Sequence, residues 1–91
     1  MVRSHIIVHG HVQGVGFRAT TKQIAEQLDL NGWVKNKNDG SVEIEAEGDS
    51  SNLKQFVDQL NDGPTPFAKV EAIDIEDFDS EKGYETFKVK E

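Results

Sequence analysis

The sequence predicts an α+β fold in which two helices cover one face of a mainly antiparallel β-sheet. Three observations support this fold class. Short segments alternate apolar and polar residues, which is the period of a β-strand. Two longer stretches repeat apolar residues at the spacing of a helix. The segments follow in the order strand, helix, strand, strand, helix, strand, with an additional C-terminal strand.

The first strand is predicted over residues 3–12, and the first helix begins at Phe17. Along this helix an apolar stripe runs at helical spacing as far as Leu28. We expect Asn31-Gly32 to end the helix, because asparagine and glycine readily take a left-handed backbone conformation.

Two further strands are predicted over residues 33–37 and 41–47. The second of them alternates strictly, with apolar residues on one face and glutamates on the other. Asn38-Asp39-Gly40 lies between the two strands. Asp-Gly is typical of a tight hairpin because it tolerates positive φ angles, so we expect a hairpin here.

A second helix is predicted after Asp49-Ser50-Ser51, whose side chains are candidate N-caps. Asp62-Gly63-Pro64 ends it. A fourth strand is expected over residues 70–75, where irregular alternation indicates a β-bulge, and a fifth over residues 86–90.

This order of elements fixes the topology. Each helix connects two strands that can lie in one sheet, and crossovers of the same hand place both helices on the same face. The expected result is a ferredoxin-like α/β sandwich, βαββαβ with an additional C-terminal strand. The length suits one domain, so we predict a single domain over residues 1–91.

The composition excludes several classes of protein. With 17 acidic and 10 basic residues the formal net charge is −7, which repels nucleic acid and anionic membranes, so neither is expected as a partner. No apolar run could span a bilayer, and no signal peptide is evident. The absence of cysteine excludes disulfides and a thiol nucleophile. We expect a cytoplasmic protein, and the lack of a long apolar patch favours a monomer.

The glycine-rich segment Gln13–Gly16 is the first candidate site. It lies between the first strand and the first helix, where a glycine-rich turn can direct successive backbone N–H groups at one point. The helix N-terminus adds unpaired N–H groups and the positive end of its dipole. Arg18 can bind two oxygens of a phosphate or carboxylate. The alternative is a tight turn whose glycines only permit positive φ angles, with Arg18 in solvent.

Asn36 is the second candidate. It lies on the same strand face as Val34, close to the hairpin, and its side-chain amide offers an acceptor and two donors that could orient a water molecule. The alternative is that Asn36 caps the 38–40 turn, a common use of asparagine near a hairpin. Lys35 and Lys37 lie on the opposite strand face and are expected to influence the approach of an anionic ligand.

Two rows of polar residues could suggest other chemistry. His5, His9 and His11 share a strand face, but the pattern places no further ligand with them, so we favour a solvated face and expect no metal. For the glutamate row within residues 43–47 we expect an exposed face, because acid–base catalysis needs a partner in a cleft.

Two stretches resemble the signatures of the acylphosphatase family. VHGHVQGVGFRATT, Val8–Thr21, resembles the first signature, which is glycine, any residue, valine and then Gln-Gly-Val-Gly-Phe-Arg. GWVKNKNDGSVEIEAEG, Gly32–Gly48, resembles the second, which is glycine-aromatic-valine, then asparagine, then Asp-Gly and an alternating strand. The resemblance continues into PFAKVEAI and covers nearly the whole chain in matching order and spacing.

The resemblance implies a hydrolase acting on acid anhydrides, which converts acyl phosphates into a carboxylate and inorganic phosphate. By position, Arg18 would pair with phosphate oxygens and Asn36 would orient the attacking water, and these are the implied catalytic residues. The family uses no metal, no other cofactor and no phosphoenzyme. The implied phosphate-binding residues are Gln13, Gly14, Val15, Gly16, Phe17 and Arg18.

Two non-catalytic interpretations share the fold. One is a phosphate- or anion-binding module, similar to the acylphosphatase-like domain at the start of hydrogenase maturation proteins, and a lone chain of 91 residues is expected to disfavour it. The other is an RNA-binding domain, which the acidic third strand and the net charge of −7 disfavour.

Overall fold

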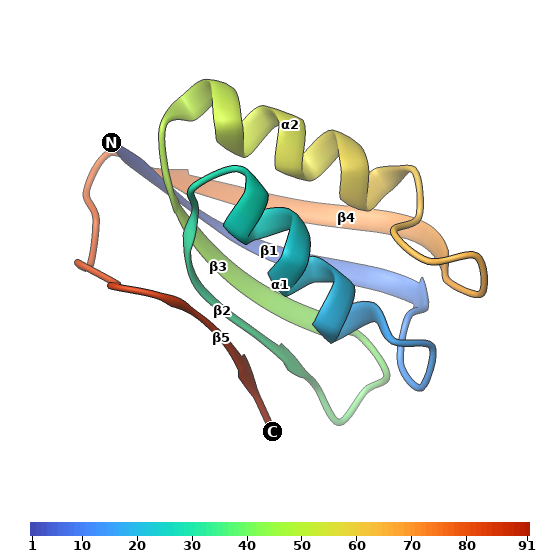
Figure 1. Cartoon of the computed structure of the whole chain (residues 1–91). Helices are drawn as coiled ribbons and strands as arrows, with labels where there is room; N and C mark the ends of the chain where they lie inside the picture. Colours follow the sequence, from blue (N-terminus) through green and yellow to red (C-terminus); the bar gives the residue numbers. More distant parts are fainter.

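The computed structural model describes residues 1–91 and contains one five-stranded sheet with two helices on one of its faces (Figure 1). The elements are β1 (Val2–His11), α1 (Phe17–Gln27), β2 (Asn31–Asn36), β3 (Val42–Gly48), α2 (Ser50–Asn61), β4 (Lys69–Phe78) and β5 (Phe87–Lys90). The predicted ferredoxin-like order, βαββαβ with an additional C-terminal strand, is confirmed. No helix has the length and apolar character needed to cross a membrane.

The strands lie in the order β4-β1-β3-β2-β5. All neighbours are antiparallel except β2 and β5, which are parallel, so the prediction of a mainly antiparallel sheet is confirmed. The predicted β-bulge is also present. His9 pairs with Ala72 but Gly10 pairs with Val70, which leaves Glu71 as an extra residue in β4.

The hydrophobic core lies between the helices and the sheet. Residues that alternate along β1 and β3 face the helices, and side chains from both helix stripes meet them, among them Phe17 and Phe56, which are almost completely buried. The ring of Phe56 also packs edge-to-face against Phe87 of β5, with centroids 6.3 Å apart. Burial of each large apolar side chain contributes about 1.5–3 kcal/mol, so these contacts are a main source of stability.

The end of α1 differs from the prediction. Asp29, with a φ angle of 55°, takes the left-handed conformation, whereas Asn31 and Gly32 already belong to β2. The amide of Leu30 donates to the carbonyl oxygen of Ala25, which turns the chain sharply and buries Leu30. Gly32 is needed inside the strand for another reason, because a Cβ atom there would lie 1.9 Å from the carbonyl oxygen of Glu45.

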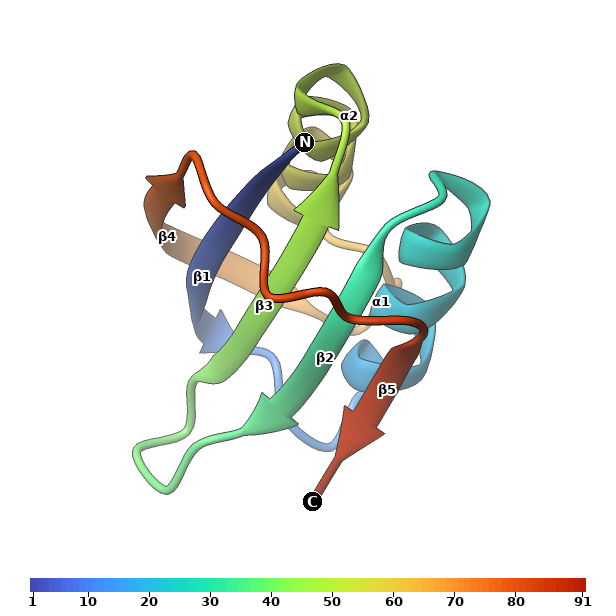
Figure 2. The same ribbon diagram turned by 90° about the vertical axis from the view of Figure 1, so that its left-hand side faces the viewer.

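The prediction of an exposed glutamate row on β3 is wrong. Glu45 and Glu47 are each only 4% exposed. The cause is the connection between β4 and β5, residues 79–86, which crosses the face of the sheet opposite the helices and which we call the strap (Figure 2). The local pattern of β3 does not predict that these glutamates are buried, because the strap that covers them comes from a distant part of the chain.

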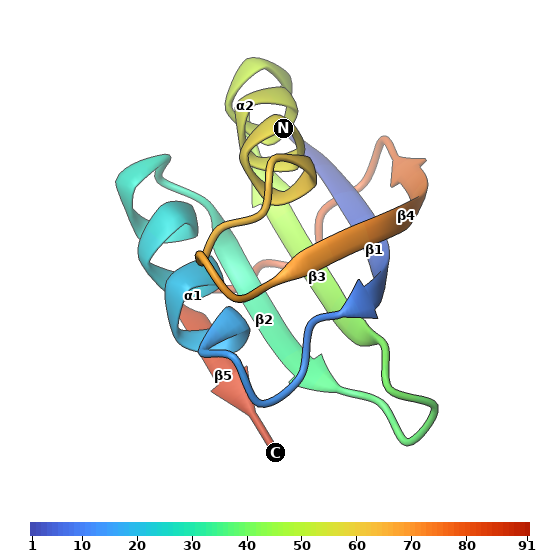
Figure 3. The same cartoon turned by 90° about the vertical axis from the view of Figure 1, so that its right-hand side faces the viewer.

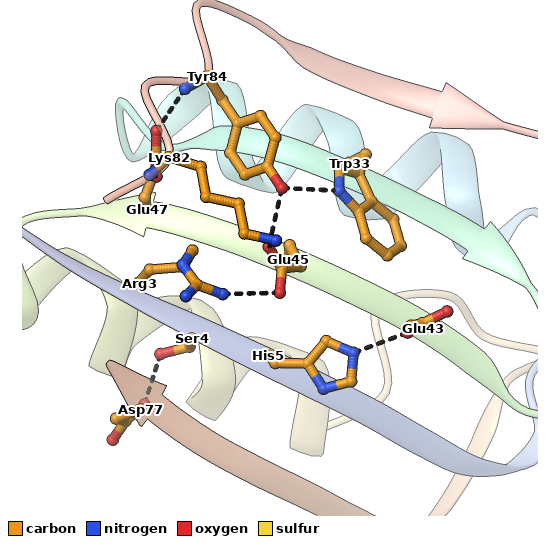
Figure 4. A network of polar contacts seen from close by, with 10 residues as sticks. All are labelled: Arg3, Ser4, His5, Trp33, Glu43, Glu45, Glu47, Asp77, Lys82 and Tyr84. Carbon is orange, nitrogen blue, oxygen red and sulfur yellow. Dashed lines mark hydrogen bonds and ion pairs between the residues drawn. The ribbon is translucent and has the colours of Figure 1, made fainter. Parts of the chain in front are cut away.

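The strap is tied to these two carboxylates (Figure 4). Glu47 accepts hydrogen bonds from the backbone amides of Lys82, at 2.8 Å, and Tyr84, at 2.5 Å, one on each carboxylate oxygen. Glu45 accepts from the Tyr84 hydroxyl at 2.8 Å and from Arg3 at 2.9 Å. Burial and the hydrogen bond to Glu45 raise the pKa of Tyr84 above its ordinary value of 10.0, so the hydroxyl keeps its proton and donates it.

Candidate active site

The loop between β1 and α1 leaves a run of backbone amides free. Gly14 and Gly16 have φ angles of 74° and 77°, which a residue with a side chain rarely adopts. The first helical hydrogen bond runs from the Thr20 amide to the Gly16 carbonyl, at 3.2 Å, and no amide of residues 13–18 donates to an acceptor in the protein. Free N–H groups of this kind, together with the N-terminus of a helix, are an arrangement that can bind an anion.

The Gln13 side chain fixes this loop to the β2–β3 hairpin. Its amide donates to the carbonyl oxygen of Lys37 at 2.7 Å and to that of Ser41 at 2.9 Å. The hairpin itself has the predicted turn, in which the Asp39 carboxylate accepts from the amide and hydroxyl of Ser41. These bonds hold the pKa of Asp39 below its ordinary value. Asp39, and not Asn36, is therefore the residue that caps the turn.

Arg18 is held by the last strand of the sheet. Its Nη1 atom donates to the carbonyl oxygen of Lys90 in β5, at 2.8 Å. This contact spans 72 residues of sequence and leaves the other N–H groups of the guanidinium without a partner in the protein. The alternative of an Arg18 that only meets solvent does not describe the structure.

Asn36 lies beside the same loop. A hollow of about 210 Å³, which we call the loop hollow, is lined by residues of the β1–α1 loop, the start of α1, the end of β2 and β5. Figure 3 shows the ribbons of these parts of the chain. The side-chain oxygen Oδ1 of Asn36 is buried and has no hydrogen-bond partner. The hollow is lined by Val12, Gly14, Gly16, Phe17, Arg18, Ala19, Asn36 and Val89.

The lining of the loop hollow defines what it can bind. It offers a guanidinium, an amide side chain and backbone N–H groups, but no carboxylate, imidazole or thiol. A lining of this kind suits an anion, and it contains neither a nucleophile nor a general acid. The hollow is small, and its charge is opposite to that of the chain as a whole, which carries −7.

The predicted site residues divide into two groups. Gly14, Gly16, Phe17, Arg18 and Asn36 line the loop hollow. Gln13 directs its side chain to the hairpin, and Val15 packs against the core, so that only their backbone amides remain for a ligand.

Sequence reasoning missed Val89 and Lys90, which complete the site from the C-terminal strand. No signal near those two residues points to the loop, because only the parallel pairing of β5 with β2 brings them there.

The histidine row lies on the other face of the sheet, and two of its three members pair with acids. His5 contacts Glu43 at 2.7 Å, and His9 contacts Asp74 at 2.9 Å. Burial opposes ionisation of Glu43, but the hydrogen bond from His5 and the charges of His5 and Lys35 outweigh it, so the pKa of Glu43 lies below its ordinary value of 4.5. This row takes no part in the loop hollow.

Comparisons with known proteins agree with this geometry. A family model described as acylphosphatase matches residues 4–89. An acylphosphatase from Bacillus velezensis is 45% identical over 98% of both chains. The crystal structure of acylphosphatase from Bacillus subtilis is 43% identical, covers both chains completely and superposes with a TM-score of 0.97. A structure of full-length HypF in the phosphate- and nucleotide-bound form is 26% identical, with a TM-score of 0.85, and the match spans 12% of that chain.

A match of this extent, to a family model and to relatives of the same length, fixes the family independently of the site residues. The chain belongs to the acylphosphatase family.

Proposed function

We propose that this protein hydrolyses acyl phosphates by direct attack of water on a phosphoryl group bound in the loop hollow. Family membership supports the activity. The observation that supports the site is the convergence of free backbone amides, Arg18 and the unpartnered Oδ1 of Asn36 around one hollow.

The loop amides and Arg18 bind the phosphoryl oxygens. In the transition state negative charge is spread over these oxygens, and fixed donors stabilise it without having to reorganise. Arg18 is oriented by Lys90 before the substrate arrives, which reduces the cost of ordering its side chain. Removal of a comparable donor lowers the rate of an enzyme by about 10²–10³.

Asn36 orients the attacking water. Its Oδ1 accepts a hydrogen bond from the water, whose oxygen forms the new bond to phosphorus on the side opposite the acyl oxygen. The bond between phosphorus and the acyl oxygen breaks, the carboxylate leaves, and the proton of the water passes to a phosphate oxygen or to solvent. A carboxylate has a conjugate acid with a pKa of about 4, so the departing group needs no general acid. This agrees with the lining of the hollow, which offers none.

A second candidate function is phosphate binding without turnover. The match to part of HypF, whose structure contains phosphate, favours it. The relatives of the same length are acylphosphatases, which favours the enzyme. The two candidates share the site and differ only in catalysis.

One experiment separates them. Purified protein treated with a chelator is incubated with benzoyl phosphate, and release of inorganic phosphate is measured beside binding of inorganic phosphate. An acylphosphatase releases phosphate well above the spontaneous rate, whereas a binding module binds phosphate but leaves that rate unchanged. Arg18→Gln lowers release by about 10²–10³ and weakens phosphate binding. Lys22→Gln, which removes the same charge from α1 outside the hollow, retains both.

The remaining sequence predictions concern organisation. We propose that residues 1–91 act as one domain, and that the protein is a cytoplasmic monomer with acyl phosphates and inorganic phosphate as its ligands. Light scattering at concentrations from micromolar to millimolar tests the monomer directly, because a dimer doubles the measured mass.

A further inference from the structure

Strand β5 forms one side of the loop hollow, but only a few contacts hold this strand in place. It comprises four residues, pairs only with β2, and lies at the edge of the sheet. Its Val89 lines the hollow, and its Lys90 carbonyl accepts the hydrogen bond from Arg18. The position of the guanidinium therefore depends on where β5 lies.

Two contacts fix β5 on its N-terminal side. Phe87 is buried in the core against Phe56, and the Gly32 amide donates to the Thr86 carbonyl oxygen at 2.9 Å. The strap, which leads into β5, contains no helix or strand, and its residues are exposed except for the half-buried Tyr84. Apolar burial thus contributes little to holding the strap.

Hydrogen bonds to two glutamates of β3 hold the strap on the sheet. Glu47 accepts the amides of Lys82 and Tyr84 on its two carboxylate oxygens, and Glu45 accepts the Tyr84 hydroxyl, which also receives the indole N–H of Trp33 at 3.1 Å (Figure 4). Both carboxylates are buried, where a hydrogen bond to a charged group is stronger than in water. Glutamate side chains are rarely buried to this extent. Here each carboxylate oxygen of Glu45 and Glu47 contacts the strap or the guanidinium of Arg3.

We propose that Glu47 is a positioning residue for catalysis. By fixing the strap, Glu47 sets the location of β5, and through the Lys90 carbonyl it orients Arg18 toward the phosphoryl group. Glu45 and Tyr84 support the same connection. The proposal rests on the proposed function, because it assigns Arg18 the role of phosphoryl ligand.

The test is a double-mutant cycle between Glu47 and Arg18. Glu47→Gln keeps the volume of the side chain, but its amide nitrogen faces one of the two strap amides as a second donor, so one hydrogen bond is lost. We expect kcat/KM for benzoyl phosphate to fall about threefold to thirtyfold, the range of couplings carried through packed networks, and the inhibition constant of inorganic phosphate to rise in parallel. In an Arg18→Ala background the same substitution has no further effect on the residual rate, because the group that Glu47 positions is gone.

Two further variants distinguish positioning from general loss of stability. Glu43→Gln removes a carboxylate from the same strand that does not contact the strap, and it leaves kcat/KM unchanged. Tyr84→Phe removes the hydroxyl and its contacts with Glu45 and Trp33, but keeps the backbone bond to Glu47. It lowers kcat/KM in the same direction by a smaller factor, which provides the test if Glu47→Gln does not fold. Kinetics are measured well below the unfolding temperature of each variant.

The outcomes separate the two proposals. If the unmodified protein fails to hydrolyse any acyl phosphate, the proposed function is wrong. If it is active but folded Glu47→Gln keeps full kcat/KM, or loses the same factor with and without Arg18, Glu47 does not act through Arg18 and the positioning role is overturned.

Discussion

The side-chain amide of Gln13 donates a hydrogen bond to the carbonyl oxygen of Lys37 at 2.7 Å and joins the two halves of the site. Gln13 belongs to the loop that presents the backbone amides, and Lys37 follows Asn36 at the end of β2. The second bond of the amide, to Ser41, holds the far side of the same hairpin. The loop and Asn36 are therefore fixed to each other by one side chain, although 23 positions separate Gln13 from Asn36 in the sequence.

Replacement of Gln13 by methionine tests this connection. Methionine has nearly the same length but cannot donate, and the two carbonyls keep their backbone partners within the hairpin. We expect the free energy of unfolding to fall by about 1–2 kcal/mol, the value of two ordinary hydrogen bonds, and kcat to fall because Asn36 is less well fixed. Denaturant unfolding and kcat for benzoyl phosphate measure the two effects. Gln23→Met, on the exposed side of α1, is the matched control, and equal losses in both variants would contradict the role of Gln13.

The fold was accessible from sequence because its signals are local. Apolar periodicity, the Asp-Gly hairpin and the glycines at positions 14 and 16 each act within a few residues, and the structure agrees with them. The buried state of Glu45 and Glu47 was not accessible, because it depends on a strap almost forty residues away along the chain. The same holds for Val89 and Lys90 beside Arg18. Contacts between segments that are far apart in the sequence cannot be predicted from the local pattern of either segment.

Asn36 offers a prediction in which stability and activity separate. Its Oδ1 is buried without a partner, so removal of the amide relieves an unsatisfied polar group while it deletes the proposed ligand of the water. We expect Asn36→Ala to change the free energy of unfolding by less than about 1 kcal/mol, because the lost packing and the relieved polar group offset each other. In contrast, kcat falls by about 10²–10³, with little change in the inhibition constant of inorganic phosphate.

The control for this variant is Asn38→Ala, an exposed asparagine in the adjacent turn, which retains full activity. A large rise in the phosphate inhibition constant of Asn36→Ala would place Asn36 in phosphate binding and remove it from the positioning of water.

Lysines on the face of the sheet opposite the helices offer a prediction about the approach of substrate. Lys35 and Lys90 face each other across β2 and β5 and both lie against the Trp33 ring, at 5.4 and 4.6 Å from its centroid. Lys37, Lys88 and Lys90 make no ion pair with a carboxylate in this acidic chain, so their charge remains available to an anion in solution.

We expect Lys37→Met to lower kcat/KM about twofold to fivefold at low ionic strength and to have no effect at 0.5 M salt, where the Debye length is only a few ångströms. Lys54→Met, on α2, removes the same unit of charge far from the loop hollow and leaves kcat/KM unchanged. Identical behaviour of the two variants would mean that net charge, and not the position of Lys37, affects the rate.

The His5–Glu43 pair predicts how stability responds to acid. The pKa of Glu43 lies below 4.5 in the folded protein, so the folded state binds the Glu43 proton less readily than the unfolded chain does. The stabilisation from this carboxylate is therefore fully present above about pH 5 and is lost as the pH falls below 4.5 through the lowered pKa. We expect urea unfolding to show that Glu43→Gln is less stable than the unmodified protein at about pH 6, and that this difference shrinks as the pH falls to about 3.

The control is Glu26→Gln, on the exposed side of α1, which shows no such pH-dependent difference. A Glu43→Gln deficit of the same size at both pH values would mean that the carboxylate stabilises the fold through packing and not through its charge.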